Sequence, residues 1–541
     1  MHPPRSTDDA AWPTDLDGFW MFDQIHAPRP LTPLSQDIVM RAMTDGFCIA
    51  LAELGCPFEF RFRTINEYAY AAFLPVASPE PAERYRANVD ALLPRLAERW
   101  QHEWLPAIMP GLDCLCATDY AALEDATLLA TLDTLRRDLV GRWRVHGFLL
   151  FCYQAASAFD DFYRATLQPA DTSEPYQLLQ GYPTKAYAAQ CGFWELGRQI
   201  RSSATLRRLF AAGADLDCLR EHCEASDFLD MLGAHLRSFG WRSDACIELA
   251  APMWHEDPTP ALNALASLAA CDETESPVAR LAQVAARRER LLHAARARLA
   301  GNPDLLQRFE HQYALARHHV VLDEDHNFFI DQMGNSGMRM PVLELGRRLA
   351  DRHALARRDD VFMLVVDEIR DGLAGAPLRG LVEHRRAELE RCAVLMPPHA
   401  LGTPPQQETD DPLIAALIKT DLPPPLRANA PGVVRGTPAS PGVARGRAKV
   451  AFDLAQASTI RPGEILVCEM TLPPWSMLFS TVAAVVADTG GVLSHCATVA
   501  RECGIPCVVG TTVGTTTIRD GMELLVDGSK GEVLLLRPAA A

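Results

Sequence analysis

One histidine of this chain lies where a strand, a glycine turn and a helix start are expected to meet. Residues 489–497 read Thr-Gly-Gly-Val-Leu-Ser-His-Cys-Ala, after the apolar run Ala483–Val486 and before a helix-forming stretch that ends near Cys503. The pattern predicts a strand that delivers His495 to a helix N-terminus, where unpaired N–H groups and the helix dipole favour a phosphate. Neutral imidazole is nucleophilic near pH 7. His495 is therefore a candidate covalent phosphate carrier, with a capping or core histidine as the alternative.

The neighbours of His495 are candidates to position a phosphoryl group. Gly490 and Gly491 let the backbone approach closely. Ser494 and Thr498 carry hydroxyls that could donate to phosphoryl oxygens, and Arg501 is a weaker candidate because it points to a different helix face. At 100° per residue, one face holds His495, Thr498, Val499 and Glu502, and the face suited to packing on a sheet holds Ala497, Ala500 and Cys503.

A longer set of motifs surrounds this histidine. It comprises Gly436–Gly446 (Gly-Thr-Pro-Ala-Ser-Pro-Gly-Val-Ala-Arg-Gly), Pro462–Val467, Thr471–Trp475, Asp520-Gly521 and Val526–Gly528. From about Pro431 to Leu536 the chain resembles the mobile phosphohistidine domain of phosphoenolpyruvate-utilising enzymes, a family that includes phosphoenolpyruvate synthase, pyruvate phosphate dikinase, rifampin phosphotransferase and the phenylphosphate synthase subunits. The resemblance implies a small β/β/α swivel domain over residues 431–541, in which His495 is phosphorylated and moves between two active sites. Leu493 and Cys496 depart from the residues usual in the family.

Composition limits the class of protein. The chain has 541 residues, 48% of them apolar, and a formal net charge of −17. This acidic balance disfavours binding to nucleic acids or anionic membranes. We expect no signal peptide and no membrane span, and a cytoplasmic protein whose fifteen cysteines are reduced thiols.

No metal site and no cofactor-binding residue is predicted. Cys114 and Cys116 are too close in sequence for the usual zinc spacing. A second group of residues could in principle bind a metal through histidine and aspartate side chains. Its members, His318, His319, Asp323, Asp325 and His326, do not show a repeated ligand spacing.

Residues 1–395 show mainly helical periodicity and predict an α-rich, substrate-binding domain. The clearest helical stretches are Ala87–Trp104, Ala122–Phe151, Ala279–Ala300 and Val342–His353. Phe58–Arg63 and Val361–Val366 are expected to be extended, as is the proline-containing stretch Pro30–Leu34. Residues 396–430 are rich in proline and predict either an extended tether or a packed crossover.

A looser resemblance covers roughly Trp12–Leu395, which is similar to the central substrate domain of rifampin phosphotransferase and related natural-product enzymes. It is carried by the motifs around Trp20, Asn66–Tyr70, Asp325–Ile330 and Asp359–Leu364. Aromatic residues of these motifs could line a cavity for an aromatic or apolar substrate, with core packing as the alternative. The candidate substrate-binding residues are Trp20, Tyr68, Tyr70, Asp325, His326 and Phe328, and the candidate acceptor-side bases are His326, Asp325 and His319.

An ATP-grasp domain and a pyruvate-binding barrel are not recognisable in these residues. Ile200–Thr205 is briefly similar to an ATP-binding element, but an ordinary amphipathic stretch, Leu206–Phe210, follows it. By analogy with the split subunits of phenylphosphate synthase, the resemblance implies a separate ATP-grasp subunit that supplies Mg²⁺ and ATP.

Three functions stay open. The first is the acceptor-side component of an ATP-dependent phosphotransferase, in which His495 carries the phosphoryl group to a small organic substrate. The second is an ATP-dependent condensing or dehydrating enzyme of secondary metabolism, in which the phosphoryl group only activates the substrate. The third is a non-catalytic carrier or regulatory protein with a silent histidine.

Overall fold

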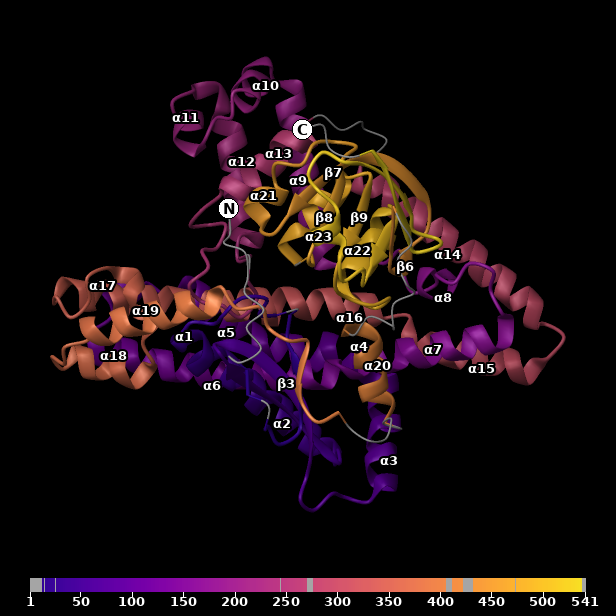
Figure 1. The fold of residues 1–541 in the computed structure, drawn as a ribbon, viewed down its shortest axis with the longest axis horizontal. Coiled ribbons are helices and arrows are strands. Elements are labelled where there is room, and N and C mark those ends of the chain that lie inside the picture. The colour runs from indigo at the N-terminus through magenta and orange to yellow at the C-terminus, as the bar shows by residue number, and fades with distance from the viewer. Residues whose placement is uncertain are drawn as a thin grey trace. The chain divides into compact units, whose positions relative to one another are not determined.

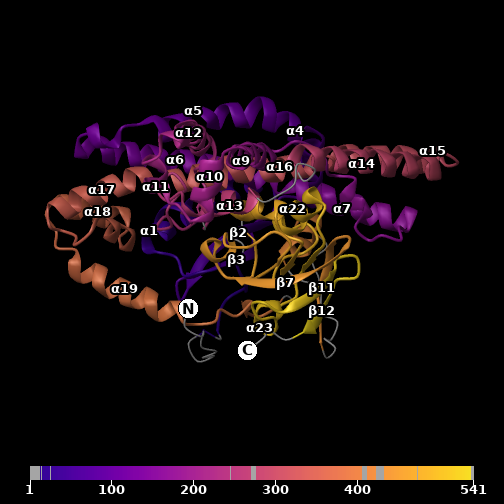
Figure 2. The same ribbon diagram turned by 90° about the horizontal axis from the view of Figure 1, so that it is seen from above.

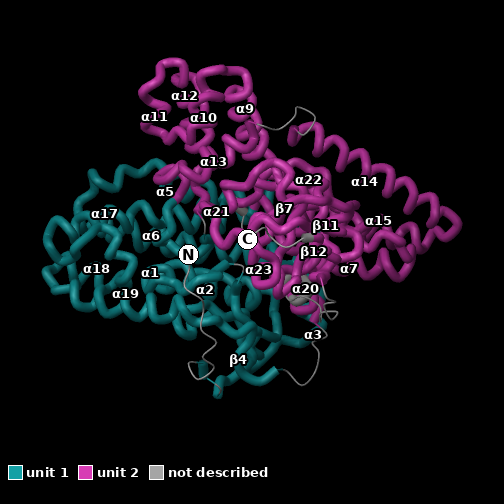
Figure 3. The backbone as a smooth tube through the Cα atoms, turned by 45° about the horizontal axis from the view of Figure 1, so that its top comes forward, with its two compact units in different colours: residues 1–151, 245–252, 326–408 teal, residues 152–244, 253–325, 409–541 magenta. Residues whose placement is uncertain are grey.

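The computed structural model describes residues 12–13, 15–24, 26–243, 245–269, 276–404, 411–421, 432–471 and 473–537 (Figure 1). The chain forms two compact units, coloured separately in Figure 3. Unit 1 comprises residues 1–151, 245–252 and 326–408, and unit 2 comprises residues 152–244, 253–325 and 409–541. The chain is helix-rich and carries a C-terminal β-containing domain, as the sequence predicts.

Unit 1 contains a four-stranded sheet in the order β2-β3-β1-β4, with strands β1 (Phe19–Phe22), β2 (Phe58–Ile65), β3 (Tyr68–Pro75) and β4 (Ala400–Gly402). A two-residue turn joins β2 to β3, and both turn residues, Asn66 and Glu67, have positive φ angles of 48° and 61°. Such a turn matches the twist of an antiparallel hairpin. The two-residue turn fixes the register of β2 against β3, with Ile65 opposite Tyr68.

The helices of unit 1 include a tightly packed pair, α2 and α6. A Cβ atom on Gly46 of α2 would lie 2.5 Å from Cβ of Trp143, and one on Gly147 of α6 would lie 2.7 Å from Cβ of Ala50. Glycine therefore sets how closely these two helices approach. The helical segments of this unit are α1 (Pro33–Ser35), η2 (Gln36–Met40), α2 (Arg41–Leu54), α3 (Ala82–Leu92), η3 (Leu93–Arg95), α4 (Leu96–Arg99), η4 (Trp100–Trp104), α5 (Leu105–Ala117), η5 (Tyr120–Ala122), α6 (Asp125–Leu149), η8 (Asn327–Ser336), α17 (Arg339–Asp351), η9 (Arg358–Met363), α18 (Val366–Leu373) and α19 (Arg379–Ala393).

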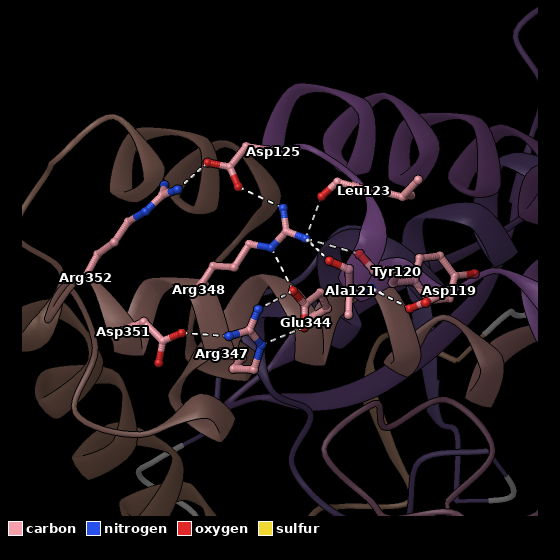
Figure 4. Close-up of polar contacts among 10 residues, drawn as sticks. All are labelled: Asp119, Tyr120, Ala121, Leu123, Asp125, Glu344, Arg347, Arg348, Asp351 and Arg352. Atoms are coloured by element: carbon pink, nitrogen blue, oxygen red, sulfur yellow. Dashed lines mark hydrogen bonds and ion pairs between the residues drawn. The ribbon is translucent and has the colours of Figure 1, made fainter.

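A buried arginine on α17 fixes the start of α6 (Figure 4). Its guanidinium donates to the carbonyl of Leu123 at 2.6 Å, to Asp125 Oδ1 at 2.9 Å and to Glu344 Oε1 at 2.7 Å. This residue, Arg348, thus satisfies carbonyls of the turn before α6 and pairs with the acidic residue in its first turn. A planar fork of donors is suited to holding several acceptors at once.

Residues 245–252 belong to unit 1 because polar groups hold them there. The buried carboxylate of Glu248 accepts from the Thr32 backbone N–H at 2.8 Å and from the Thr32 hydroxyl at 2.7 Å, which caps the start of α1. Asn335 donates to the carbonyl of Cys246 at 3.1 Å, and Arg339 donates to the carbonyl of Leu249 at 2.8 Å.

Unit 2 contains the second group of helices. Helices α14 and α15 form a hairpin (Figure 1), whose two helices overlap in the view of Figure 2, and Arg296 on α14 pairs with Glu310 on α15 at 2.7 Å. The helical segments are α7 (Phe151–Leu167), α8 (Glu174–Gln177), α9 (Lys185–Ser202), α10 (Ala204–Ala211), α11 (Leu216–Arg220), η6 (Cys223–Ala225), α12 (Ser226–Phe239), α13 (Thr259–Leu268), α14 (Pro277–Leu299), α15 (Pro303–Ala316), α16 (His319–His326), α20 (Pro412–Asp421), α21 (Leu454–Ala457), η10 (Pro473–Ser480), α22 (His495–Cys503) and α23 (Gly514–Thr517).

The C-terminal part of unit 2 is an eight-stranded sheet in the order β5-β12-β11-β7-β8-β9-β10-β6. Its central strands β7 to β10 are parallel, and β8, β9 and β10 are buried along their whole lengths, as their uninterrupted apolar sequences require. The strands are β5 (Val433–Arg435), β6 (Thr437–Ser440), β7 (Val443–Ala451), β8 (Ile465–Cys468), β9 (Ala484–Ala487), β10 (Cys507–Val509), β11 (Glu523–Asp527) and β12 (Glu532–Arg537).

Helices from residues 152–325 pack on this β domain within unit 2. One hydrophobic core contains Phe193 and Leu265 from the helical part together with Leu466, Val485 and Ala500 from the β domain. Polar contacts accompany it, since the Ser267 hydroxyl donates to the carbonyl of Ile460 at 2.8 Å.

Two expectations about local structure are wrong. Val361–Val366 is not extended, because η9 ends at Met363 and α18 begins at Val366. The carboxylates of Asp360 and Glu368 cap these two helices through the N–H groups of Arg357 and Val365. In the stretch Pro30–Leu34, helix α1 already begins at Pro33, since proline is favourable in a first helical turn.

The predicted linker, residues 396–430, is described only in part. Ala400–Gly402 form β4, which pairs with β1, and Pro412–Asp421 form α20. Residues 405–410 and 422–431 lie outside the described residues, and they include four of the eight prolines of the predicted linker. The boundaries at 395 and 431 stay a prediction.

Candidate active site

Helix α22 begins as the sequence predicts. Gly490 has a φ angle of 87°, Ser494 is the N-cap, and the Ser494 hydroxyl accepts from the N–H of Ala497 at 3.4 Å. Gly504, with a φ angle of 67°, ends the helix in the left-handed conformation. His495 is thus the first helical residue, next to unpaired N–H groups of the first turn.

The turn before His495 requires glycine. A Cβ atom on Gly490 would lie 2.8 Å from Ser494 Oγ, in a backbone conformation that L residues adopt at a cost. We expect Gly490→Ala to lower the free energy of unfolding by about 2–3 kcal/mol, from the left-handed backbone plus overpacking. The matched control is Gly213→Ala, where φ is 73° but no heavy atom lies within 4 Å, and the expected loss is about 1 kcal/mol. Urea unfolding measures both, and equal losses would contradict the close contact.

A carboxylate holds one nitrogen of the His495 ring. His495 Nδ1 lies 2.9 Å from Oε1 of Glu324 on α16, and the exposed fractions of the two side chains are 15% and 2%. The Nε2 atom of the same ring is buried and has no hydrogen-bond partner among the described residues. When Nδ1 carries the proton that Glu324 accepts, the lone pair is on Nε2. The ring is therefore arranged with Nε2 as its nucleophilic atom.

Charges around His495 change its basicity. Burial acts to lower the pKa of His495, but the Glu324 carboxylate, aided by Asp323, outweighs it and the pKa is raised. Arg242 is buried, and its pKa is lowered to about 10 by desolvation, which Glu324 opposes. Glu502, one turn beyond Thr498 on α22, has a pKa raised by burial and by Glu324. The site thus combines one imidazole with several carboxylates and a buried arginine.

Asp323 and Asp325 extend the acidic run on α16. Asp323 accepts a hydrogen bond from the Tyr153 hydroxyl. Asp325 accepts from the N–H of Lys185 at 2.8 Å at the start of α9, and burial raises the pKa of Asp325 to about 6. His319 on the same helix lies with Nδ1 3.3 Å from Cys152 Sγ, and burial lowers the pKa of His319 to about 3.

Thr498 and Arg501 lie deeper than expected. The face of α22 that holds His495 and Thr498 is covered by the helical part of unit 2, and Gln180 Nε2 donates to the Thr498 carbonyl at 3.4 Å. Arg501 donates to the carbonyl of Ala439 at 2.9 Å and to the Thr498 hydroxyl at 3.4 Å, and its guanidinium lies over the ring of Tyr176. Both residues therefore join α22 to its surroundings, and a role toward phosphate stays a prediction.

Leu493 and Cys496, which differ from the residues usual in the family, both lie in hydrophobic cores. Leu493 packs in a cluster with Leu179 and Phe309, and Cys496 Sγ lies 3.8 Å from Cys507 Sγ. A cavity beside α22, lined in part by Tyr187, Glu502 and Cys503, has a volume of about 20 Å³, which is room for about one water molecule.

The aromatic candidates of the N-terminal part lie in unit 1. Trp20, Tyr68 and Tyr70 come together in one buried cluster of the four-stranded sheet. The hydroxyl of Tyr68 donates to the carbonyl of Leu395 at 3.0 Å, and that of Tyr70 donates to the carbonyl of Pro398 at 3.1 Å. These contacts hold the sheet to the end of the helical region, and a role in substrate binding stays a prediction.

Asp325, His326 and Phe328 are close in sequence, but Asp325 belongs to unit 2 whereas His326 and Phe328 belong to unit 1. His326 contacts His146 and Asp331 in unit 1, with the two imidazole centroids 4.2 Å apart. Phe328, on η8, packs edge to face against Phe329. Asp325 belongs to unit 2, on the α9 side of α16.

Two residues of the site were missed by sequence reasoning, Glu324 and Arg242. The only signal for Glu324 was its position in the run Asp323-Glu-Asp-His, where its neighbours were singled out instead. Arg242 carried no motif at all.

Comparison with known proteins finds a family match for the β domain of unit 2 and another for its helical part. Residues 460–531 match the PEP-utilising enzyme mobile domain, and residues 147–324 match the rifampicin phosphotransferase fourth domain. His495 lies in the first match, and Glu324 is the last residue of the second. In the part of the chain that the structure describes, no helix has the length and apolarity to cross a membrane.

Several relatives are similar over long stretches. Chondramide synthase cmdD of Chondromyces crocatus is 35% identical over 97% of this chain, which spans 14% of that protein. The uncharacterised phosphotransferase YvkC of Bacillus subtilis is 25% identical over 97% of this chain and 62% of its own length. Rifampicin phosphotransferase of Streptomyces sviceus is 34% identical over 37% of this chain and 21% of its own length. The chain thus spans less than two thirds of each of these relatives. The chain thus carries a segment that matches the mobile domain of PEP-utilising enzymes and one that matches the fourth domain of rifampicin phosphotransferase, and it is similar to proteins named as phosphotransferases.

Proposed function

We propose that this chain is the acceptor-side component of an ATP-dependent phosphotransferase in which Nε2 of His495 carries the phosphoryl group. The observation that carries the proposal is the ring itself, with Nδ1 bonded to Glu324 at 2.9 Å and Nε2 unpartnered at the start of α22. Nε2 of His235 and of His319 is also buried without a partner among the described residues, so the carboxylate on Nδ1 and the position at the start of α22 distinguish His495.

The phosphoryl group reaches His495 from a separate ATP-grasp subunit, which binds Mg²⁺ and ATP. The Nε2 lone pair attacks phosphorus of the nucleotide, the P–O bond to the nucleotide breaks, and a phosphoramidate forms. The β domain then moves on the proline-rich segment 396–430 to the helical part of the chain. We place this chemistry in the cytoplasm, where ATP is available and thiols stay reduced.

Glu324 acts in the second half-reaction, in which the phosphoryl group passes from His495 to the acceptor. With phosphate on Nε2 and a proton on Nδ1, the ring is a good leaving group, because the P–N electron pair returns to Nε2 of a neutral imidazole. The Glu324 carboxylate keeps that proton on Nδ1. An acceptor oxygen attacks phosphorus and gives its proton to a base. Of the candidates Asp325, His319 and His326, Asp325 has a pKa of about 6, which suits a base near neutrality.

Intact-mass spectrometry tests the proposal. The chain is incubated with Mg²⁺, ATP and a candidate ATP-grasp partner, then quenched in alkali, which preserves phosphohistidine. We expect one acid-labile phosphate per chain, formed only when the partner is present. An adduct without the partner would contradict the separate donor, and no adduct with a partner that phosphorylates another carrier would favour the silent-histidine alternative.

A second candidate is favoured by one comparison. The identity to a segment of a chondramide synthase supports a role in secondary metabolism, in which the phosphoryl group activates a hydroxyl or carbonyl and then leaves. Product analysis separates the two functions: a stable phosphorylated product supports transfer, and free phosphate with a new bond or double bond supports activation.

A further inference from the structure

Three side chains with metal-ligand atoms converge in the core of unit 1. Within the part of the chain that the structure describes, His146, His326 and Asp331 place one ligand atom each within 4.8 Å of one another. Their exposed fractions are 4%, 2% and 1%. They come from α6, the end of α16 and η8.

The geometry of the three side chains is close to that of a metal site. His146 Nδ1 lies 3.1 Å from Asp331 Oδ1, and His326 Nε2 lies 3.9 Å from Asp331 Oδ2. Ligand atoms that are each about 2.1 Å from one cation lie about 3.0–3.4 Å apart. The first pair meets this spacing. The second pair, which uses the other carboxylate oxygen, needs a shift of about half an ångström, and since the three ligand atoms lie within 4.8 Å of one another, side-chain rotation has to bring them closer around one cation.

The surroundings orient the ligands. The ring of His146 stacks on Trp143 with centroids 4.7 Å apart and meets Phe47 edge to face. Trp143 is itself held, because its Nε1 donates to Asn335 Oδ1 at 3.2 Å. Asp331 lies in the π-helical segment η8, a rare backbone form that is frequent at functional sites.

We propose that His146, His326 and Asp331 bind one divalent first-row transition cation, with Zn²⁺ the best match. Two imidazoles and one carboxylate are a donor set that suits Zn²⁺, Fe²⁺ or Mn²⁺ and leaves further positions for water. The enclosed position gives the cation a structural role, in which it joins α6 to η8. A cation of this kind adds binding free energy to folding of unit 1.

Metal analysis of the full chain, made without a histidine tag, tests this site. After incubation with Zn²⁺ and dialysis, we expect about one equivalent per chain, and a melting temperature that falls when a chelator removes it. His146→Gln and Asp331→Asn should each reduce the bound metal about ten-fold or more. The matched control is His235→Gln, a buried histidine of unit 2 that should retain the metal.

X-ray absorption at the zinc edge of the wild-type chain gives an independent test that does not depend on folding of the variants. We expect nitrogen and oxygen ligands with imidazole scattering. Sulfur ligands would overturn the assignment, because they would place the metal on cysteines. Less than about a tenth of an equivalent in the wild type would also overturn it, as would equal metal contents in His146→Gln and His235→Gln.

Discussion

His495→Asn is expected to abolish phosphorylation of the chain, with a loss on the order of 10³-fold or more. The asparagine amide can still donate to Glu324, so the contact made by Nδ1 is retained, but no nucleophile replaces Nε2. The measurement is the initial rate of adduct formation by mass spectrometry with a saturating ATP-grasp partner.

The control for this variant is His293→Asn, an exposed histidine on α14 that should be phosphorylated like the wild type. Circular dichroism of both variants establishes that they are folded. A His495→Asn chain that still accepts a full equivalent of phosphate would show that the carrier is another residue.

Glu324→Gln is expected to separate the two half-reactions. Transfer from phosphorylated His495 should slow about 10²-fold or more, since a neutral amide no longer keeps the proton on Nδ1 of the leaving ring. Phosphorylation at the partner should change little, because His495 has left Glu324 in that state. Single-turnover chase of the isolated phosphorylated chain, in water or with an acceptor, measures the transfer step.

The pH dependence of this step has a definite sign. The Glu324 carboxylate raises the pKa of His495. We expect it to raise the pKa of Nδ1 in the phosphorylated ring for the same reason, so transfer falls as pH rises through the pKa of that ring. In Glu324→Gln the pKa of the ring is lower, and the fall moves to lower pH. The same contact stabilises the fold below the unfolded pKa of histidine and is lost as pH rises through the folded value.

The matched control is Glu310→Gln, which removes an exposed ion pair with Arg296 on α14. Its profile of transfer rate against pH should coincide with that of the wild type. Coincident profiles for Glu324→Gln and the wild type would contradict the role of Glu324.

The sequence predicts helix α22 well because the residues that begin and end this helix are local in sequence. Two glycines, the N-cap Ser494 and the C-terminal Gly504 fix the ends of α22, and the apolar run before it forms β9. Periodicity likewise predicts the helical stretches at residues 87–104, 122–151, 279–300 and 342–353, which overlap α3 to η4, α6, α14 and α17. The hairpin β2–β3 was only half anticipated, because its turn, Asn66-Glu67, lacks the glycine that usually marks a two-residue hairpin.

The partners of His495 could not be predicted, because they come from distant segments. Glu324 is 171 residues from His495 in sequence, and no local pattern pairs a carboxylate with a histidine over that separation. The burial of Thr498 has the same origin, since helical periodicity shows which residues share a face but not what covers it. The His146–Asp331 contact spans 185 residues, so ligand spacing in the sequence does not indicate the metal site proposed above.

The most direct test of the account is to locate the phosphate on the imidazole. The chain, labelled with ¹⁵N-histidine, is phosphorylated with ATP and its ATP-grasp partner, and ³¹P and ¹⁵N NMR identify the bonded nitrogen. The account predicts one phosphohistidine, at residue 495, with phosphorus bonded to Nε2 and a proton on Nδ1. Phosphorus on Nδ1 would contradict it, because a phosphorylated Nδ1 could not return to its contact with Glu324, and so would phosphorus on any other residue.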